Sequence, residues 1–586
     1  MTSPIGRLAA LLAAAAFALC LFPRAPRAGA EMDIHKHIPD TQLKKQIARF
    51  SQVDVDYDQS VLSAPEEKAL AKLVQAGAVM DEIFLRQVWS GNLDLRRQLV
   101  HAVSTDGKNK ALWNDLYHFF RINFGPWNRL DGNPPFIGNI EKPAGAGFYP
   151  DNITKDEFES FCTAHPDQND AMRGFFTVIT RDEHGSLRAV PYSDAYSNLL
   201  ADASRLLNEA ADILTSDKAR GELRAGVDYT TLATFLRSRA AAFSSNNYFQ
   251  SDMDWMDVRD NILDVTIGPY ETYEDGLNGY KASFEAFVAI RNPKDSRALS
   301  GLKQALPAME RNLPIPDKYK NFHRGTDSPI SVVDVAFVGG DSKAGVQTLA
   351  FNLPNDERVR EAKGSKKVML KNISQAKYNE ILVPIAHRVL DTSQMQYVNF
   401  HSYFTNALMH ELSHGLGPGR IVVDGRKTTV SRELKTNYAP IEEAKADIMG
   451  LYNKAFLAGR GEVDHEEMQK SYICFLPGFF RAIRFGIHEA HGRANMIEYN
   501  YIKEHGAISL NEKTGRYTVH VDKMPDAIRA LTHDLCMIEA LGDYARADSF
   551  ITKYGQVPDE VTHHLAKLTD IPADIEPVYS AQKFLK

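Results

Sequence analysis

HELSH, residues 410–414, ends a segment from about residue 397 in which Phe400, Phe404 and Leu408 recur at helical spacing. The pattern predicts a helix with a buried apolar face, ended by the glycine- and proline-rich stretch 415–419. Residues four apart lie on the same face of a helix. The segment therefore predicts a core helix with two imidazoles side by side.

Two imidazoles on one helical face are typical of a zinc site. His410 and His414 can bind one ion, while Glu411 points at water on that ion. In one class of such sites a third histidine follows six residues later, but the residue here is Arg420. The remaining option is a carboxylate from the following helix.

That following helix is predicted from Pro440 to about Leu451, where apolar residues again recur at helical spacing. We expect Glu443 to be the third zinc ligand. Asp447, one turn further on, can accept a hydrogen bond from a ligating imidazole. We assign Glu442 to the same supporting role.

Three ligands leave one position of a tetrahedral zinc ion open, and an open position implies hydrolysis. Glu411 would take the proton of the attacking water and pass it to the leaving amine. The predicted reaction is cleavage of a peptide bond by a chain that binds one zinc ion.

The rest of the chain alternates between helical and strand-like patterns. Ser63, Pro65 and Glu66 supply a cap, a first-turn proline and a first-turn acid for one helix, and helical patterns continue to about residue 245. Short apolar runs predict strands at 330–338, 346–352 and 367–373, and a hairpin at 508–521. We predict a mostly α chain with a β insert.

Composition narrows the class of protein. A chain of 586 residues is long enough for two or more lobes. Its formal charge of −7 and its lack of long Lys/Arg blocks argue against a nucleic-acid partner. The four cysteines form no C-x-x-C pair, which excludes a cysteine-built metal site. At most one disulfide is expected among Cys162, Cys474 and Cys536, and we interpret the last two as buried thiols.

The first thirty residues have the pattern of an export signal. Arg7 precedes an apolar run from Leu8 to Phe22, and Ala28-Gly29-Ala30 offers small residues for cleavage. The run is shorter than the roughly 20 residues that span a bilayer. We expect an exported, periplasmic protein with no stable membrane anchor after cleavage.

Several stretches resemble the dipeptidyl peptidase III family of zinc metallopeptidases. Residues 442–447, EEAKAD, are similar to the family's E-E-C-R-A-E, and HELSH resembles its first zinc motif, H-E-x-x-G-H, with one residue fewer. Residues 267–275 resemble its I-G-F-I-E-S-Y-R-D, and residues 351–356 its I-N-I-P-N-Y-D. The resemblance covers about residues 261–510.

The resemblance implies roles for five further residues. It assigns Glu271, Asn352 and Asn355 to the free amino terminus of a peptide, and Tyr273 and His491 to the developing oxyanion. The chemistry agrees, because a carboxylate and two amide oxygens satisfy an ammonium group, while a phenol and an imidazole can donate to an oxyanion.

The resemblance also implies an α+β, mostly α architecture: two lobes around a wide cleft, one helical and zinc-binding, the other mixed with a small β-barrel. The lobes should close around an extended peptide and expel water. The expected boundaries are a signal peptide at 1–30, the mostly helical part of the mixed lobe at 31–295, a segment of the helical lobe at 296–330, the barrel strands at 331–378, the catalytic lobe at 379–555 and a C-terminal return to the mixed lobe at 556–586.

By this resemblance we expect a peptidase that releases dipeptides from the amino terminus of short peptides. Three alternatives stay open: a zinc aminopeptidase, an enzyme acting on amides of cell-wall peptides, and a non-catalytic periplasmic peptide-binding protein. Glu411 argues against the last, since a bare binding site has no use for it. Asn495 stands where the family has an arginine, which leaves the preferred peptide length open. The sequence carries no signal of an oligomeric state.

Overall fold

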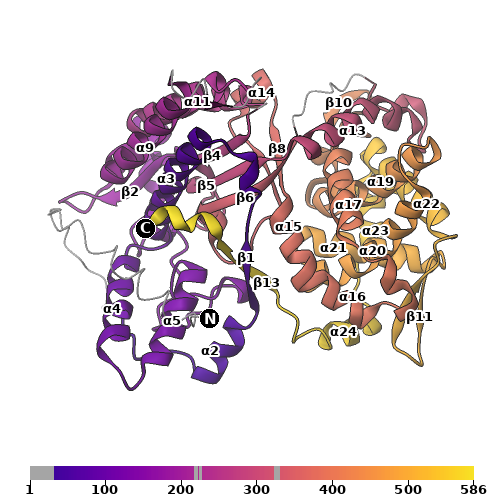
Figure 1. Ribbon diagram of the computed structural model, residues 1–586, viewed down its shortest axis with the longest axis horizontal. Helices are drawn as coiled ribbons and strands as arrows, with labels where there is room; N and C mark the ends of the chain where they lie inside the picture. Colours follow the sequence, from indigo (N-terminus) through magenta and orange to yellow (C-terminus); the bar gives the residue numbers. More distant parts are fainter. Residues whose placement is uncertain (1–31, 217–221, 224–226, 260, 323–329) are drawn as a thin grey trace.

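The computed structural model consists of two lobes and describes every residue except 1–31, 217–221, 224–226, 260 and 323–329 (Figure 1). The first lobe combines helices with a central sheet, and the second is built mainly of helices. This arrangement confirms the predicted fold class. The expected leader, residues 1–30, lies outside the described residues. None of the described helices is long and apolar enough to cross a bilayer.

The first lobe is organised around the long helix α3 (Ala64–Val88). Its start is the predicted one: the backbone N–H of Ser63 donates to the Glu66 carboxylate at 2.7 Å, and Pro65 lies in the first turn. The buried face of α3 packs against α9 and the central sheet. The other main helices of this lobe are α4 (Asn92–Thr105), α5 (Lys110–Asn123), α9 (Ser197–Thr215), α11 (Thr230–Ser245) and α12 (Phe249–Asp257).

Five strands form the central sheet, in the order β4-β5-β6-β8-β7. The three predicted strands are present as β6 (Ile330–Gly340), β7 (Ala350–Leu353) and β8 (Lys366–Leu370). β8 is shorter than expected because helix α15 (Lys371–Lys377) follows it directly. β4 (Leu263–Glu271) and β5 (Ser283–Arg291) lie in the part that we expected to be mostly helical. Both are buried on almost every residue. β5 has a continuous apolar run at 286–290, whereas residues 263–267 of β4 alternate between apolar and polar although both faces are covered.

The expected small β-barrel is not confirmed. β4 and β7 are the edge strands, and no pairing between them closes the sheet in the described part of the chain. The two edges nevertheless approach each other: the Asn355 side-chain amide donates to the carbonyl of Tyr270 at 3.1 Å. The rings of Phe287 and Phe351 stack with centroids 4.3 Å apart. A strongly curved open sheet therefore brings the end of β4 next to the loop after β7.

The second lobe is a group of packed helices. Its main members are α17 (Phe400–Ser413), α19 (Tyr438–Gly459), α20 (His465–Ile483), α21 (Ala490–Glu504), α22 (Met524–Leu541) and α23 (Tyr544–Tyr554). The predicted hairpin is present as β11 (Ile508–Asn511) and β12 (Arg516–Val519).

The chain then returns to the first lobe, where β13 (Asp574–Tyr579) pairs in parallel with β1 (Phe50–Val55) (Figure 1).

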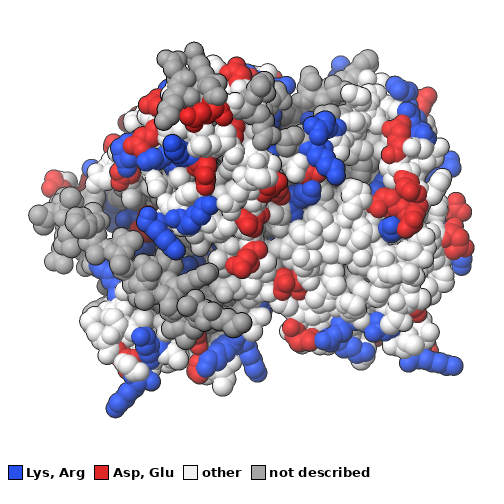
Figure 2. All heavy atoms as spheres, viewed as in Figure 1, with Lys and Arg blue, Asp and Glu red and all other residues white. Residues whose placement is uncertain are grey.

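The face in Figure 2 has no single-sign charged surface, and no disulfide is present in the described part of the chain. Figure 2 shows acidic and basic side chains interspersed on the viewed face, with a broad part of the helical lobe carrying neither. Cys162, Cys474 and Cys536 are buried free thiols, so no disulfide joins them.

Candidate metal centre

The paired histidines lie at the C-terminal end of α17. Asn399 caps the start of this helix by accepting a hydrogen bond from the N–H of Ser402, and Leu408 and Leu412 anchor its buried face. His410 is buried, and His414 follows one turn later as the residue that ends the helix. Their Nε2 atoms lie 3.0 Å apart. Helical spacing thus brings the two imidazoles together as predicted.

Helix α19 supplies the third group. One carboxylate oxygen of Glu443, Oε2, lies 3.4 Å from Nε2 of His410 and 3.7 Å from Nε2 of His414. The two helices approach closely because α19 has Gly450 at the crossing, where a Cβ would lie 3.0 Å from the backbone nitrogen of His410. The three side chains are a potential metal-binding group.

The dimensions of this group suit a tetrahedral zinc ion. Nitrogen and oxygen ligands about 2.0–2.2 Å from zinc, at tetrahedral angles, lie roughly 3.3–3.5 Å from one another. The three observed separations bracket that range. Oε2 of Glu443 is buried and has no hydrogen-bond partner in the described part of the chain, as expected of an oxygen that serves a cation.

Two carboxylates hold the imidazoles from behind. Nδ1 of His410 donates to Asp447 at 2.7 Å, and Nδ1 of His414 donates to Glu442 at 2.8 Å. These bonds occupy both Nδ1 atoms and direct both Nε2 atoms at the centre, where they can bind a metal ion. Asp447 and Glu442 therefore stand where the sequence reasoning expected them.

A further layer of charged and polar groups supports these carboxylates. The buried ammonium group of Lys445 lies 2.9 Å from Glu442, and the Asn495 amide donates to Asp447 at 3.4 Å. Burial opposes ionisation of Glu442, but Lys445 and His414 together hold the pKa of this carboxyl well below its usual value. Lys445 lies in the EEAKAD motif, but its burial beneath Glu442 depends on how α19 packs.

The predicted general base, Glu411, points toward the first lobe. Its carboxylate lies 2.5 Å from Nζ of Lys367 on β8. Burial raises the pKa of Glu411, but His410 and Lys367 outweigh that effect, so the pKa is lowered and the group is ionised. Sequence reasoning missed Lys367, because a lysine in a short strand is typical of an exposed position.

His491 lies beside the triad, with Nε2 3.3 Å from Oε2 of Glu443. It is the second residue of α21, and Glu489 fixes the ring through a contact of 3.1 Å to Nδ1. Its side chain is 56% exposed, so one side of the ring is free to meet a ligand.

The residues expected to bind the amino terminus of a peptide lie where β4 and β7 end. We call Glu271, Asn352 and Asn355 the amino-terminal clamp. Burial raises the pKa of Glu271, partly offset by a hydrogen bond from Asn355. Oδ1 of Asn352 is buried and has no partner in the described part of the chain. Tyr273 stands apart: it is 89% exposed and makes no described contact with the histidines or Glu443.

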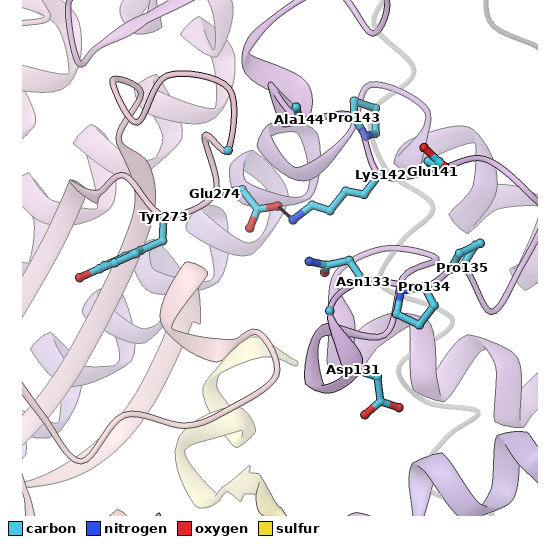
Figure 3. Close-up of a pocket in the computed structure, with 12 residues that line it drawn as sticks. Asp131, Asn133, Pro134, Pro135, Glu141, Lys142, Pro143, Ala144, Tyr273 and Glu274 are labelled. Carbon is cyan, nitrogen blue, oxygen red and sulfur yellow. Dashed lines mark ion pairs between the residues drawn. The ribbon is translucent and has the colours of Figure 1, made fainter. Parts of the chain in front are cut away.

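A pocket of about 550 Å³ adjoins the loop that follows β4 and carries Tyr273 (Figure 3). Glu274 lies at its edge, with its carboxylate 2.8 Å from Arg129 and 2.6 Å from Lys142. Figure 3 shows the ring of Tyr273 pointing away from Glu274 and from the rest of the pocket. The ion pairs fix the segment that carries Glu271 and Tyr273.

Known proteins match the chain over most of its length. Peptidase family M49 matches residues 200–456. The solved structure of DPP III from Caldithrix abyssi is 45% identical, with a TM-score of 0.87, and the match covers 93% of this chain and 100% of that one. The structure of dipeptidyl-peptidase III from Corallococcus sp. strain EGB is 42% identical, with a TM-score of 0.76, over 93% and 99% of the two chains.

Curated relatives add two names. Nudix hydrolase 3 of Arabidopsis thaliana is 35% identical over 92% of this chain and 74% of that protein. Dipeptidyl peptidase 3 of Homo sapiens is 26% identical over 38% of this chain and 30% of that protein. The two-lobed fold and these matches define a metallopeptidase. The chain belongs to the dipeptidyl peptidase III family, Peptidase family M49.

Proposed function

We propose that this protein is a zinc-dependent exopeptidase that releases dipeptides from the amino terminus of short peptides. The observation that carries the proposal is the convergence of His410, His414 and Glu443, with Glu411 beside them. We propose a peptidase despite the match to Nudix hydrolase 3, because the family that matches and both solved relatives are peptidases by name.

Zinc binding follows from the donor set. His410, His414 and Glu443 would hold one ion, and Asp447 and Glu442 keep the imidazoles in the ligating tautomer. When bound, zinc supplies Lewis acidity, which polarises a substrate carbonyl and acidifies water.

Glu411 is the group that moves the proton. Its lowered pKa keeps the carboxylate ionised near neutral pH, ready to accept a proton from the attacking water. Glu411 would then donate that proton to the leaving amine as the peptide bond breaks. His491, beside Glu443, would donate to the oxyanion that forms on the carbonyl oxygen.

The substrate's amino terminus would bind between the ends of β4 and β7. Glu271 offers a carboxylate and Asn352 a free amide oxygen, and Asn355, whose amide donates to the carbonyl of Tyr270, lies beside Glu271. Tyr273 is solvent-exposed, so we propose that it reaches the reacting carbonyl only when the lobes close over a peptide.

The proposal is tested by identifying the products. Purified, zinc-loaded protein is given free and N-acetylated peptides of several lengths, and mass spectrometry follows the fragments, with Glu411→Gln beside the wild type. We expect successive dipeptides from free peptides, none from acetylated ones and none from the variant.

Other outcomes would choose among the alternatives. Release of single residues would identify an aminopeptidase, and cleavage restricted to cell-wall peptides would identify an amidase. Zinc and peptide binding without cleavage by the wild type would identify a peptide-binding protein.

A further inference from the structure

A single lysine joins the strand of the amino-terminal clamp to the general base. Lys367 lies in β8, where it is paired with Asn352 of β7 on one side and Ile330 of β6 on the other. Its Nζ lies 2.5 Å from the Glu411 carboxylate and donates to the Glu411 backbone carbonyl at 3.0 Å. One side chain of the first lobe thus makes two contacts with one residue of the second lobe.

The neighbouring lysine shows that this contact is specific. Lys366 precedes it in the strand, and alternation directs the two side chains to opposite faces of the sheet. Nζ of Lys366 donates to the carbonyls of Trp255 and Val258, both within the first lobe. Lys367 is therefore the member of the pair that faces the helical lobe.

The contact also completes the end of α17. The last four carbonyls of a helix lack partners within it. The carbonyls of His410, Leu412 and Ser413 accept hydrogen bonds from the turn that follows the helix. The Glu411 carbonyl accepts from Lys367 instead. Lys367 thus holds both the side chain and the backbone of Glu411.

We propose that Lys367 is a positioning residue that sets Glu411 in register with the amino-terminal clamp. Asn352 and Lys367 are directly opposite in an antiparallel pair, so their side chains lie on the same face of the sheet with Cα atoms about 4.5–5.5 Å apart. The inference rests on the proposed function, since it concerns the same base and the same clamp.

This arrangement restrains the Glu411 carboxylate from the other lobe. Glu411 is not one of the three groups that converge on the metal position, so metal binding alone does not fix its carboxylate. A carboxylate that misses its target by about 1 Å can lose on the order of 100-fold in rate. Lys367 supplies the missing restraint, and it does so from the strand next to Asn352.

The test compares Lys367→Met and Lys367→Arg in the full-length, zinc-loaded protein acting on a free-amine peptide. Lys371→Met is the matched control, because Lys371 makes an ion pair of the same kind with Asp295, 2.6 Å away. We expect Lys367→Met to lower kcat by about 10- to 100-fold with KM and zinc affinity unchanged. Lys367→Arg should recover part of the loss, and Lys371→Met should match the wild type.

A second readout does not depend on activity. Hydrogen–deuterium exchange of metal-free protein should show faster exchange of the amides in the last turn of α17 in Lys367→Met, because this turn is no longer held by the bond from Lys367 to the Glu411 carbonyl and opens more often. If exchange is faster there but the wild-type protein releases no dipeptides, the proposed function is wrong and the contact between Lys367 and Glu411 is still supported. Unchanged exchange, unchanged or increased kcat, or a parallel loss of zinc affinity would overturn the positioning role.

Discussion

The metal centre and the amino-terminal clamp are assembled in opposite ways. The metal centre takes its three potential ligands and the two carboxylates behind the imidazoles from two neighbouring helices, α17 and α19. The clamp takes Glu271 from the end of β4, and Asn352 and Asn355 from β7 and the loop after it. The first site depends on helical spacing, whereas the second depends on the curvature of a sheet.

This difference predicts which property each site should lose first when one of its residues is substituted. The metal ligands are restrained by hydrogen bonds within their own lobe, so a change there should alter metal affinity first. The clamp residues meet only through the fold of the first lobe, so a change there should alter peptide binding first. If the two sites are independent in this sense, each substitution should alter only one of them.

The largest effect is expected at the base. Glu411→Gln should lower kcat by about 1,000-fold or more, because the amide cannot accept the proton of water. Zinc content, measured by elemental analysis, should equal that of the wild type, since Glu411 is not in the ligand group. A variant that keeps wild-type kcat would remove Glu411 from the mechanism.

Removing a carboxylate behind an imidazole should weaken zinc binding. Asp447→Asn takes away the acceptor of His410, and Glu442→Gln takes away that of His414. Each should reduce zinc affinity by about 10- to 100-fold in a chelator competition. The KM of the zinc-saturated variants should stay close to that of the wild type, and a large rise in KM would contradict the independence of the two sites.

The clamp should show the converse pattern. Glu271→Gln should raise KM for free-amine peptides by about 10-fold, because an ammonium loses its charged partner. Zinc affinity should not change, and binding of an N-acetylated peptide, measured by calorimetry, should be equal in variant and wild type. A change in zinc affinity would mean that the sheet and the helices are coupled more tightly than their contacts indicate.

A smaller effect is expected from acidification. Burial raises the pKa of Glu271, so this carboxyl becomes protonated at a higher pH than an exposed glutamate. The ionised form binds an ammonium group, so affinity should be complete above this raised pKa and be lost as the pH falls through it. Titration calorimetry with Glu411→Gln, carried downward from neutral pH, should show the loss at a higher pH than for an exposed glutamate, and adding Glu271→Gln should flatten the profile.

Sequence patterns predicted the helical parts of the molecule well. The Ser63 to Glu66 cap, the helix that carries HELSH and the helix that begins near Pro440 all lie where their periodicity placed them. The hairpin between β11 and β12 was also correct. These features depend on residues within a few positions of one another.

Sequence patterns did not predict two strands that are buried on both faces. β4 and β5 are covered on both sides. β5 has a continuous apolar run at 286–290 where a half-exposed strand alternates, and the alternation at 263–267 of β4 was not recognised as a strand. The expected barrel failed for a related reason, because local patterns give strands but not the pairing of the last strand with the first.

By itself, the sequence determined the residues of the metal centre. A helix repeats every 3.6 residues, so local order gives both the chemical character of His410, Glu411 and His414 and the common face of the two imidazoles. Only the tertiary structure decided which carboxylate holds which imidazole, where Glu271 and Asn355 meet, and that Lys367 reaches Glu411 from the other lobe. These relations join elements far apart in the chain, and their geometry follows from sheet curvature and helix packing.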